Sequence, residues 1–294
     1  MTRSKFNRRR KPKRGLLQTT ALIAGMVAVP LAALGGGGIL AYRHLNTEQI
    51  DANYCYARDD QEQTALFVDY SLTHQTSASQ KRDLRNSLIE AYERMAANGQ
   101  LSVFTTESGS TATINKPVFT LCKPAKTARE QEAIGAPASS QLKLARIYRD
   151  AQARFEGFVD AMMTQSQDRS HVAGNSPILE QLQGISRYDF GSPLSRLSIY
   201  SDGLSNSPAG RFCQKEGELP RFEVFSQRPD YRFIAPENFN GASVDIRLVE
   251  FGTLPRDGLN FCTNDELRQF WVEYFEANGA GAVRLTPLSY GAGQ

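Results

Sequence analysis

A short apolar run that stops at a carboxylate places the strongest constraint on the fold. Residues 65–73 read Ala-Leu-Phe-Val-Asp-Tyr-Ser-Leu-Thr. The run over 66–68 is too short for a helix and rich in strand formers, so it predicts a strand buried on both faces of a sheet. In a doubly wound sheet ligands bind where strands end, and Asp69, Ser71 and Thr73 offer the oxygen ligands that a hard cation such as Mg²⁺ prefers. The alternative is a strand that ends in an ordinary polar turn.

Strand and helix patterns alternate along the rest of the chain. Further apolar runs predict strands at residues 101–105, 111–121, 197–200, 244–251 and 283–285. Apolar residues at helical spacing predict helices around residues 84–95, 144–162, 178–185 and 267–275. We therefore expect an α/β fold, Rossmann-like, with a central and mainly parallel sheet that carries helices on both faces.

Capping signals mark where two of these helices begin. Thr263 and Glu266 have the spacing of a capping box, which opens the last helix. Ser176 followed by Pro177 is a natural N-cap for the shorter helix in mid-domain.

Two segments between the regular elements read as irregular structure. Residues 123–139 contain prolines and a glycine and predict a loop. Residues 204–241 are rich in Pro, Gly, Arg and aromatic residues, and we interpret them as an insertion with an edge hairpin around residues 222–225.

The amino-terminal segment differs in composition from everything that follows. Residues 1–14 hold eight of the 34 basic residues and no acid, so the remainder has 26 bases against 31 acids. Residues 16–42 carry no charge, and a bilayer core ~30 Å thick needs only about 20 such residues to be crossed. Because a cleavable signal peptide has a shorter apolar core, we predict an uncleaved transmembrane helix.

The charge asymmetry around this helix predicts its orientation. The positive-inside rule keeps the basic arm in the cytoplasm and sends the chain after Arg43 across the inner membrane into the periplasm. Such an arm can also bind nucleic acid or anionic lipid, but topology explains it without either, and we expect no nucleic-acid partner. The predicted parts are a cytoplasmic arm 1–15, a transmembrane helix 16–42, a stalk 43–62, a folded domain 63–285 and a tail 286–294.

Four cysteines agree with an extracytoplasmic domain. Cys55, Cys122, Cys213 and Cys262 lie outside the apolar segment, and none forms a CxxC pair. With only three histidines in the chain, no zinc spacing exists. Two disulfides in an oxidising compartment are the expected use, with free buried thiols as the alternative.

The polar residues at the strand ends resemble a known family. A DxSxT sequence at residues 69–73, Ser176 in mid-domain and a Ser-Asp-Gly sequence at 201–203 occur in this order along the chain. Together they resemble the von Willebrand factor type A (VWA) domain, in which a DxSxS motif, a Thr and an Asp from three loops form the metal-ion-dependent adhesion site. The resemblance covers residues 63–279 and implies a Rossmann-like fold with the metal at the carboxyl edge of the sheet.

This resemblance implies a set of metal ligands. Asp69, Ser71 and Thr73 would be the first-loop ligands, Ser176 the second-loop hydroxyl and Asp202 the fourth-loop carboxylate of a site for Mg²⁺ or Mn²⁺. Thr73 replaces the usual second Ser and Ser176 the usual Thr, and both keep a hydroxyl. We expect these side chains at exposed loop ends, and a simple N-cap is the alternative role of Ser176.

The implied function is binding. A hard cation held by hydroxyls can accept an oxygen from an acidic residue of a protein partner, which predicts a membrane-anchored adhesion or assembly module outside the cytoplasm and not an enzyme. The alternatives are a metal-assisted hydrolase that uses Asp69 and Asp202 around Mg²⁺ and a metal-free scaffold of a membrane complex. We interpret His74 and His171 as exposed loop residues, because nothing in the sequence places a nucleophile beside them.

The expected fold also predicts how the cysteines pair. The insertion after the fourth strand and the loop before the last helix should both open at the ligand-bearing edge of the sheet. We therefore pair Cys213 with Cys262, which leaves Cys55 to pair with Cys122.

Overall fold

The structure is a computed structural model, and its described residues all follow the predicted transmembrane helix. They are residues 50–56, 60–69, 78–106, 116–168, 176–207, 210–213, 219–249 and 262–288. Among them no helix is long and apolar enough to cross a membrane, and the predicted span 16–42 lies outside them.

A mixed sheet forms the centre of the described part of the chain. Its strands lie in the order β3-β2-β1-β4-β7-β8, and all neighbours are parallel except β2 and β3. Numbered along the chain, this is the doubly wound order 3-2-1-4-5-6 with the third strand reversed. The strands are β1 (Gln63–Val68), β2 (Gln100–Thr105), β3 (Phe119–Cys122), β4 (Leu194–Ser201), β7 (Ser243–Val249) and β8 (Ala282–Leu288).

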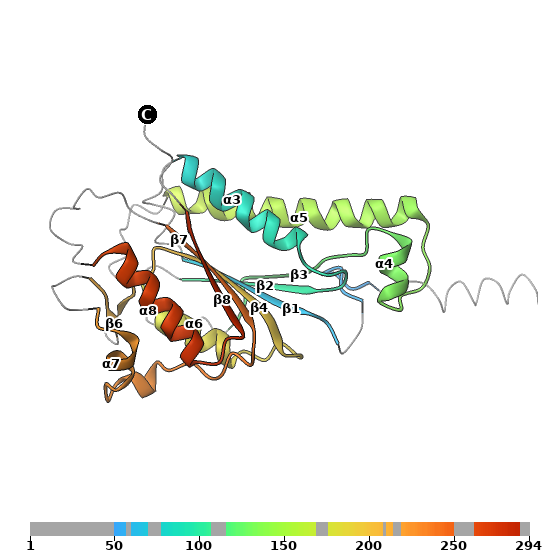
Figure 1. Ribbon diagram of the computed structural model, residues 1–294. Coiled ribbons are helices and arrows are strands. Elements are labelled where there is room, and N and C mark those ends of the chain that lie inside the picture. The colour runs from blue at the N-terminus through green and yellow to red at the C-terminus, as the bar shows by residue number, and fades with distance from the viewer. Residues whose placement is uncertain are drawn as a thin grey trace, which may run out of the picture. The chain divides into compact units, whose positions relative to one another are not determined.

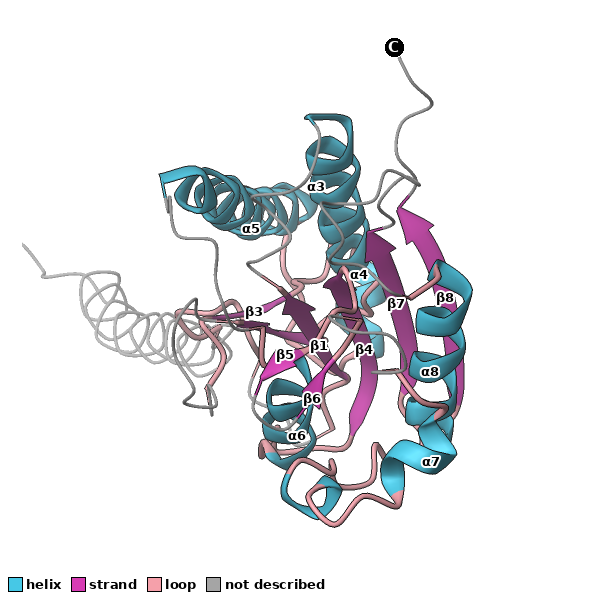
Figure 2. Cartoon of the chain, turned by 90° about the vertical axis from the view of Figure 1, so that its left-hand side faces the viewer, coloured by secondary structure: helices cyan, strands magenta, loops and turns pink. Residues whose placement is uncertain are grey.

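Helices lie on both faces of this sheet, as predicted (Figure 1). On one face are α3 (Ala78–Glu93) and α5 (Gln141–Asp168), which share a core with the sheet. On the other are α6 (Ile178–Arg187), α7 (Phe222–Ser226) and α8 (Asn264–Ala277). Figure 2 looks along the strands and shows the sheet between these two layers. The smaller elements are α4 (Ala128–Ala133), the 3-10 helix η1 (Tyr231–Phe233) and a hairpin of β5 (Asn206–Ser207) and β6 (Gly210–Arg211).

The central strand β1 belongs to both cores. All six of its residues are buried. Because side chains alternate along a strand, Leu66 and Val68 pack with α3 and α5, whereas Ala65 and Phe67 pack with α6 and α8. The predicted strand buried on both faces is therefore confirmed. Burying one large apolar side chain stabilises a fold by about 1.5–3 kcal/mol, so β1 stabilises the packing of both helix layers.

The capping box of the last helix is also confirmed. The Thr263 side chain accepts a hydrogen bond from the Glu266 backbone at 3.2 Å, and the Glu266 carboxylate accepts one from the Thr263 backbone at 2.8 Å. The helix ends at Ala277 with Asn278 as its C-cap, and Gly279 follows with a φ of 82° that favours glycine.

The predicted loop 123–139 is wrong over residues 128–133, which form α4. Thr127 and Glu130 make a second capping box there, with both reciprocal bonds present. Because the prolines of this segment flank the helix and do not interrupt it, they gave a false loop signal.

Two strand predictions are also corrected. The edge hairpin expected around residues 222–225 is the short helix α7, because Phe222 and Phe225 are three residues apart and so lie buried on one helix face. The third strand begins at Phe119, since Pro117 has no N–H for the ladder. The earlier part of that predicted strand, residues 111–115, lies outside the described residues.

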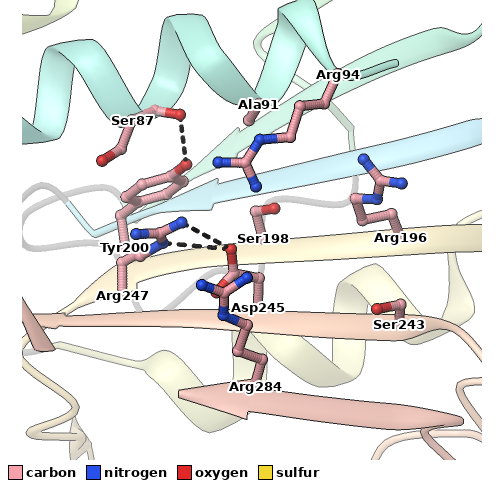
Figure 3. Close-up of a pocket in the computed structure, with 10 residues that line it drawn as sticks. All are labelled: Ser87, Ala91, Arg94, Arg196, Ser198, Tyr200, Ser243, Asp245, Arg247 and Arg284. Atoms are coloured by element: carbon pink, nitrogen blue, oxygen red, sulfur yellow. Dashed lines mark hydrogen bonds and ion pairs between the residues drawn. The ribbon is translucent and has the colours of Figure 1, made fainter. Parts of the chain in front are cut away.

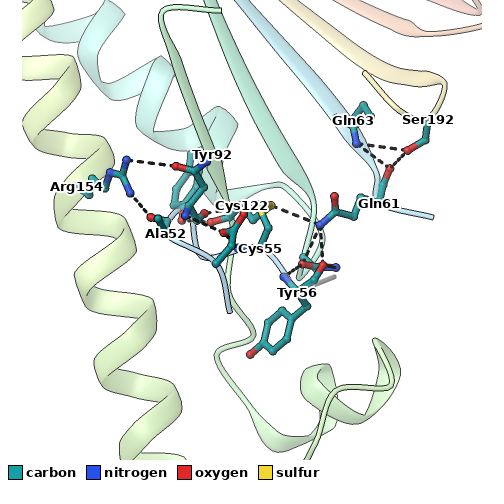
Figure 4. Close-up of a disulfide and its surroundings, with 12 residues drawn as sticks. Ala52, Cys55, Tyr56, Gln61, Gln63, Tyr92, Cys122, Arg154 and Ser192 are labelled. Carbon is teal, nitrogen blue, oxygen red and sulfur yellow. Dashed lines mark hydrogen bonds between the residues drawn. A yellow bond between two sulfur atoms is a disulfide. The ribbon is translucent and has the colours of Figure 1, made fainter. Parts of the chain in front are cut away.

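Both predicted disulfides are present. Cys213 joins Cys262, with Cα atoms 5.1 Å apart, and Cys55 joins Cys122, with Cα atoms 4.9 Å apart. The second bridge ties the segment before β1 to the end of β3 (Figure 4). There the Cys122 carbonyl accepts a bond from the Tyr92 hydroxyl at 3.3 Å, and Arg154 of α5 donates to the Ala52 carbonyl at 2.5 Å. These disulfides are consistent with an oxidising, extracytoplasmic location.

Candidate binding site at the carboxyl edge of the sheet

Asp69 occupies the point where the central strand leaves the sheet. It follows β1 directly, and its backbone N–H donates to the Tyr200 carbonyl of β4 at 2.9 Å. Its side chain is fully buried. The expectation of an exposed loop end is therefore wrong at this position, because the neighbouring strands and loops close over the carboxylate.

Three hydroxyls from separate segments donate to this carboxylate. Thr106 Oγ1 lies 2.9 Å from Asp69 Oδ1, while Ser176 Oγ and Ser201 Oγ each lie 3.0 Å from Asp69 Oδ2. A buried carboxylate is costly unless it is hydrogen-bonded, and bonds to an ionised acceptor are about twice as strong as neutral ones. We refer to Asp69, Thr106, Ser176 and Ser201 as the carboxyl-edge cluster.

Ser176 is held in place by Asn206 at the start of β5. Its backbone N–H and C=O exchange hydrogen bonds of 2.8 Å with Asn206 in an isolated bridge. The N-cap of α6 is Pro177, and the helix has no side-chain capping hydrogen bond at that position. The N-cap role for Ser176 is therefore wrong, because its hydroxyl is turned to Asp69.

The Asp202-Gly203 turn follows the end of β4 beside the cluster. Asp202 is buried, and its Oδ1 accepts the Leu204 backbone N–H at 2.9 Å. Gly203 has a φ of 73°, and a Cβ there would lie 2.8 Å from Trp271 Nε1. The same indole nitrogen donates to the Gly203 carbonyl at 3.1 Å, so α8 fixes the turn.

The structure brings together part of the predicted ligand set. Asp69, Ser176 and Asp202 all lie at this edge and all are buried. Ser71 and Thr73 lie outside the described residues.

Sequence reasoning missed two members of the cluster. Ser201 stands next to the predicted Asp202, and Thr106 follows β2 just as Asp69 follows β1. A signal was present for both, because parallel strands end at the same edge of a sheet and polar residues directly after them lie close together.

The side-chain atoms that could bind a metal ion at this edge are all oxygens. Hydroxyls that donate their protons to Asp69 keep lone pairs that can face a hard cation, and such oxygens are the ligands of Mg²⁺ and Mn²⁺. Within the described ranges no three His, Cys, Asp or Glu side chains gather in a way that could hold a metal ion. Any cation here would therefore depend on hydroxyls as much as on Asp69 and Asp202.

The described residues of this site do not include a histidine. His44, His74 and His171 all lie outside the described ranges. The part of the site that the structure describes thus offers carboxylates, hydroxyls and backbone groups, which suit binding and the orientation of a ligand.

Comparison with known protein families and curated proteins identifies no relative of this chain. The sequence matches no protein-family model, and no curated protein is similar to it.

Proposed function

We propose that the chain is a membrane-anchored, extracytoplasmic binding module of the VWA type that holds an acidic residue of a protein partner at its carboxyl edge. The doubly wound strand order supports this proposal, because it is the order of a Rossmann-like sheet. The two disulfides support the compartment.

One observation carries the proposal. The Ser176 hydroxyl donates to Asp69 across 107 positions of sequence, and Asp202 follows the neighbouring strand. These are the described members of the predicted ligand set, and they come from three different loops. Such a convergence of polar side chains from separate loops is typical of a binding site in this class of sheet.

A cation would supply the electrophilic centre that accepts the partner's carboxylate. Asp69, Ser176 and Asp202 would hold it together with Ser71 and Thr73. The buried Asp69 carboxylate would orient the hydroxyls around it, as outer hydrogen bonds do in other metal sites.

Titration calorimetry on the full-length chain in detergent tests this proposal. We expect Mg²⁺ or Mn²⁺ to bind at one site, and we expect Asp69→Asn and Ser176→Ala to weaken binding by about tenfold or more. Ser186→Ala is a matched control, because Ser186 Oγ bonds to the Gln183 carbonyl on α6. Capture of a partner from solubilised membranes should fall when a chelator is added.

A metal-free scaffold is the second candidate, and one observation favours it. The described cluster already satisfies Asp69 with three hydroxyl donors, and Asp202 Oδ1 receives a backbone N–H. If neither cation binds and partner capture persists in chelator, this second candidate replaces the first.

A further inference from the structure

One half of the sheet has a polar face where a doubly wound sheet is normally apolar. Parallel strands covered on both faces read as continuous apolar runs, yet polar and apolar residues alternate over 196–199 in β4, 243–248 in β7 and 284–286 in β8. Across these strands Ser198 lies beside Asp245 and Asp245 beside Arg284. One residue further along, Ile199, Ile246 and Leu285 pair on the opposite, apolar face.

A groove of about 200 Å³ lies over this polar face. Four arginines line it: Arg94 from the turn directly after α3, Arg196 from β4, Arg247 from β7 and Arg284 from β8. Figure 3 shows Arg94 extending over the groove from the turn at the end of α3, and Arg284 reaching up from β8 toward Asp245. We call this feature the arginine groove.

The charges in the groove are only partly matched. Arg94 pairs with Glu90, Arg196 with Glu62 at 3.9 Å and Arg247 with Asp245 at 3.1 Å. Within the described ranges the Arg284 side chain has no hydrogen bond or ion pair, although its backbone belongs to the β7–β8 ladder. A guanidinium fork therefore remains available to an anionic ligand.

The charges of the groove also act on Glu90 at its rim. The hydrogen bond from Arg94 lowers the pKa of the Glu90 carboxyl, and the positive charges of Arg247 and Arg284 add to this effect. Burial raises the pKa of the Tyr200 hydroxyl, which donates to the Ser87 carbonyl at 3.1 Å and remains neutral. The groove thus keeps a positive excess at neutral pH.

Asp245 adds a hydrogen-bond acceptor to this basic groove. Its Oδ2 accepts both bonds from Arg247, whereas its Oδ1 is buried and has no hydrogen-bond partner in the described structure. A buried acceptor without a donor is unfavourable. A ligand that carried both negative charge and an O–H would satisfy Arg284 and Asp245 Oδ1 together.

We propose that the arginine groove binds phosphate in its hydrogen-bearing form. The phosphate oxygens accept from Arg284 and Arg94, and the P–OH group donates to Asp245 Oδ1. Phosphate retains a proton throughout the neutral range, but sulfate retains none and would face the Asp245 carboxylate with a bare oxygen. The site therefore selects phosphate over sulfate by a single hydrogen bond.

The proton requirement also distinguishes the possible sources of the phosphate. A phosphate monoester, such as a sugar phosphate or the terminal phosphate of a phosphorylated lipid headgroup, has a second pKa of about 6 and has lost its O–H at about pH 8. Free inorganic phosphate still carries one there. Binding of a monoester should therefore weaken between pH 5.5 and pH 8 by at least about tenfold, while inorganic phosphate keeps its affinity.

Calorimetry on the full-length chain in detergent tests the proposal with inorganic phosphate, sulfate and glycerol phosphate. At about pH 7 we expect one phosphate per chain, with sulfate at least about tenfold weaker. Arg284→Gln should weaken phosphate by about tenfold or more. Arg187→Gln on α6, whose side chain is half exposed and lies 3.6 Å from Glu237, is the matched control and should bind normally.

The variant Asp245→Asn separates the hydrogen bond from general attraction to arginines. Its amide can donate, so it should bind sulfate more tightly than the wild type and lose the preference for phosphate. If this variant fails to fold, the ratio of phosphate to sulfate affinity of the wild-type chain decides alone. Equal affinities, or no binding of either anion, would overturn the proposal. Because this site does not use the carboxyl-edge cluster, Asp69→Asn should leave phosphate binding unchanged.

Discussion

Replacing Asp69 by Ala should test whether the carboxyl-edge cluster holds the fold as well as a ligand. The substitution removes the acceptor of three hydroxyls, from Thr106, Ser176 and Ser201, in a fully buried position. Asp69→Asn keeps the side-chain volume and one acceptor oxygen, and its amide can donate to a hydroxyl that turns round. The two variants therefore differ mainly in how many buried polar groups remain without a partner.

The expected magnitudes follow from this difference. A hydrogen bond to a charged group contributes about 1.5–3 kcal/mol, but hydroxyls freed in Asp69→Ala can rotate toward other acceptors and recover part of that energy. We expect Asp69→Ala to lower the free energy of unfolding by about 3 kcal/mol and Asp69→Asn by about 1 kcal/mol. For a domain of this size each kcal/mol lowers Tm by about 2–4 °C.

Urea unfolding of the full-length chain in detergent measures both values. Trp271 is the only tryptophan of the chain, and its indole N–H bonds to Gly203 beside the cluster, so its fluorescence reports on this region. Asp150→Ala, at an exposed position of α5, is the control and should change stability by less than about 0.5 kcal/mol. If Asp69→Ala and Asp69→Asn destabilise equally, the hydrogen-bond argument fails.

Removing the Cys213–Cys262 bridge by Ser at both positions should cost about 4 kcal/mol in urea unfolding by the chain-entropy model, and an unchanged midpoint would contradict it. Gly203→Ala should cost about 2 kcal/mol or more, since φ is 73° and the new Cβ would meet Trp271; a neutral result in the same assay would show that the turn can relax. Protease added outside spheroplasts should digest the domain and spare a tag at Met1, and a protected domain would contradict the predicted orientation.

The elements that could be predicted from sequence are those whose signal is local. The buried strand β1 is an uninterrupted apolar run, and the start of α8 is a complete capping box. The helix α4 carries an equally complete capping box, but prolines nearby obscured it. In this segment the capping box predicted the structure better than the prolines did, because its side chains bond to specific backbone groups.

The cluster around Asp69 was harder to predict because it depends on register. Val68 lies beside Thr105 of β2 and Tyr200 of β4, and only this pairing brings the next residue of each strand together. No local pattern sets such a register. The pairing of Ser176 with Asp69 depends further on the bridge between Ser176 and Asn206, which joins segments that the sequence does not link.

The arginine groove, in contrast, is indicated by a local sequence pattern. A charged side chain at every second position of a parallel strand cannot lie under a well-packed helix, because burying a charge is costly. The alternation of Asp245 and Arg247 with apolar residues in β7 therefore indicates a sheet face that is only partly covered. The prediction of helices on both faces is right for the centre of the sheet, but over β7 and β8 the polar alternation shows where the described helices leave room for a ligand.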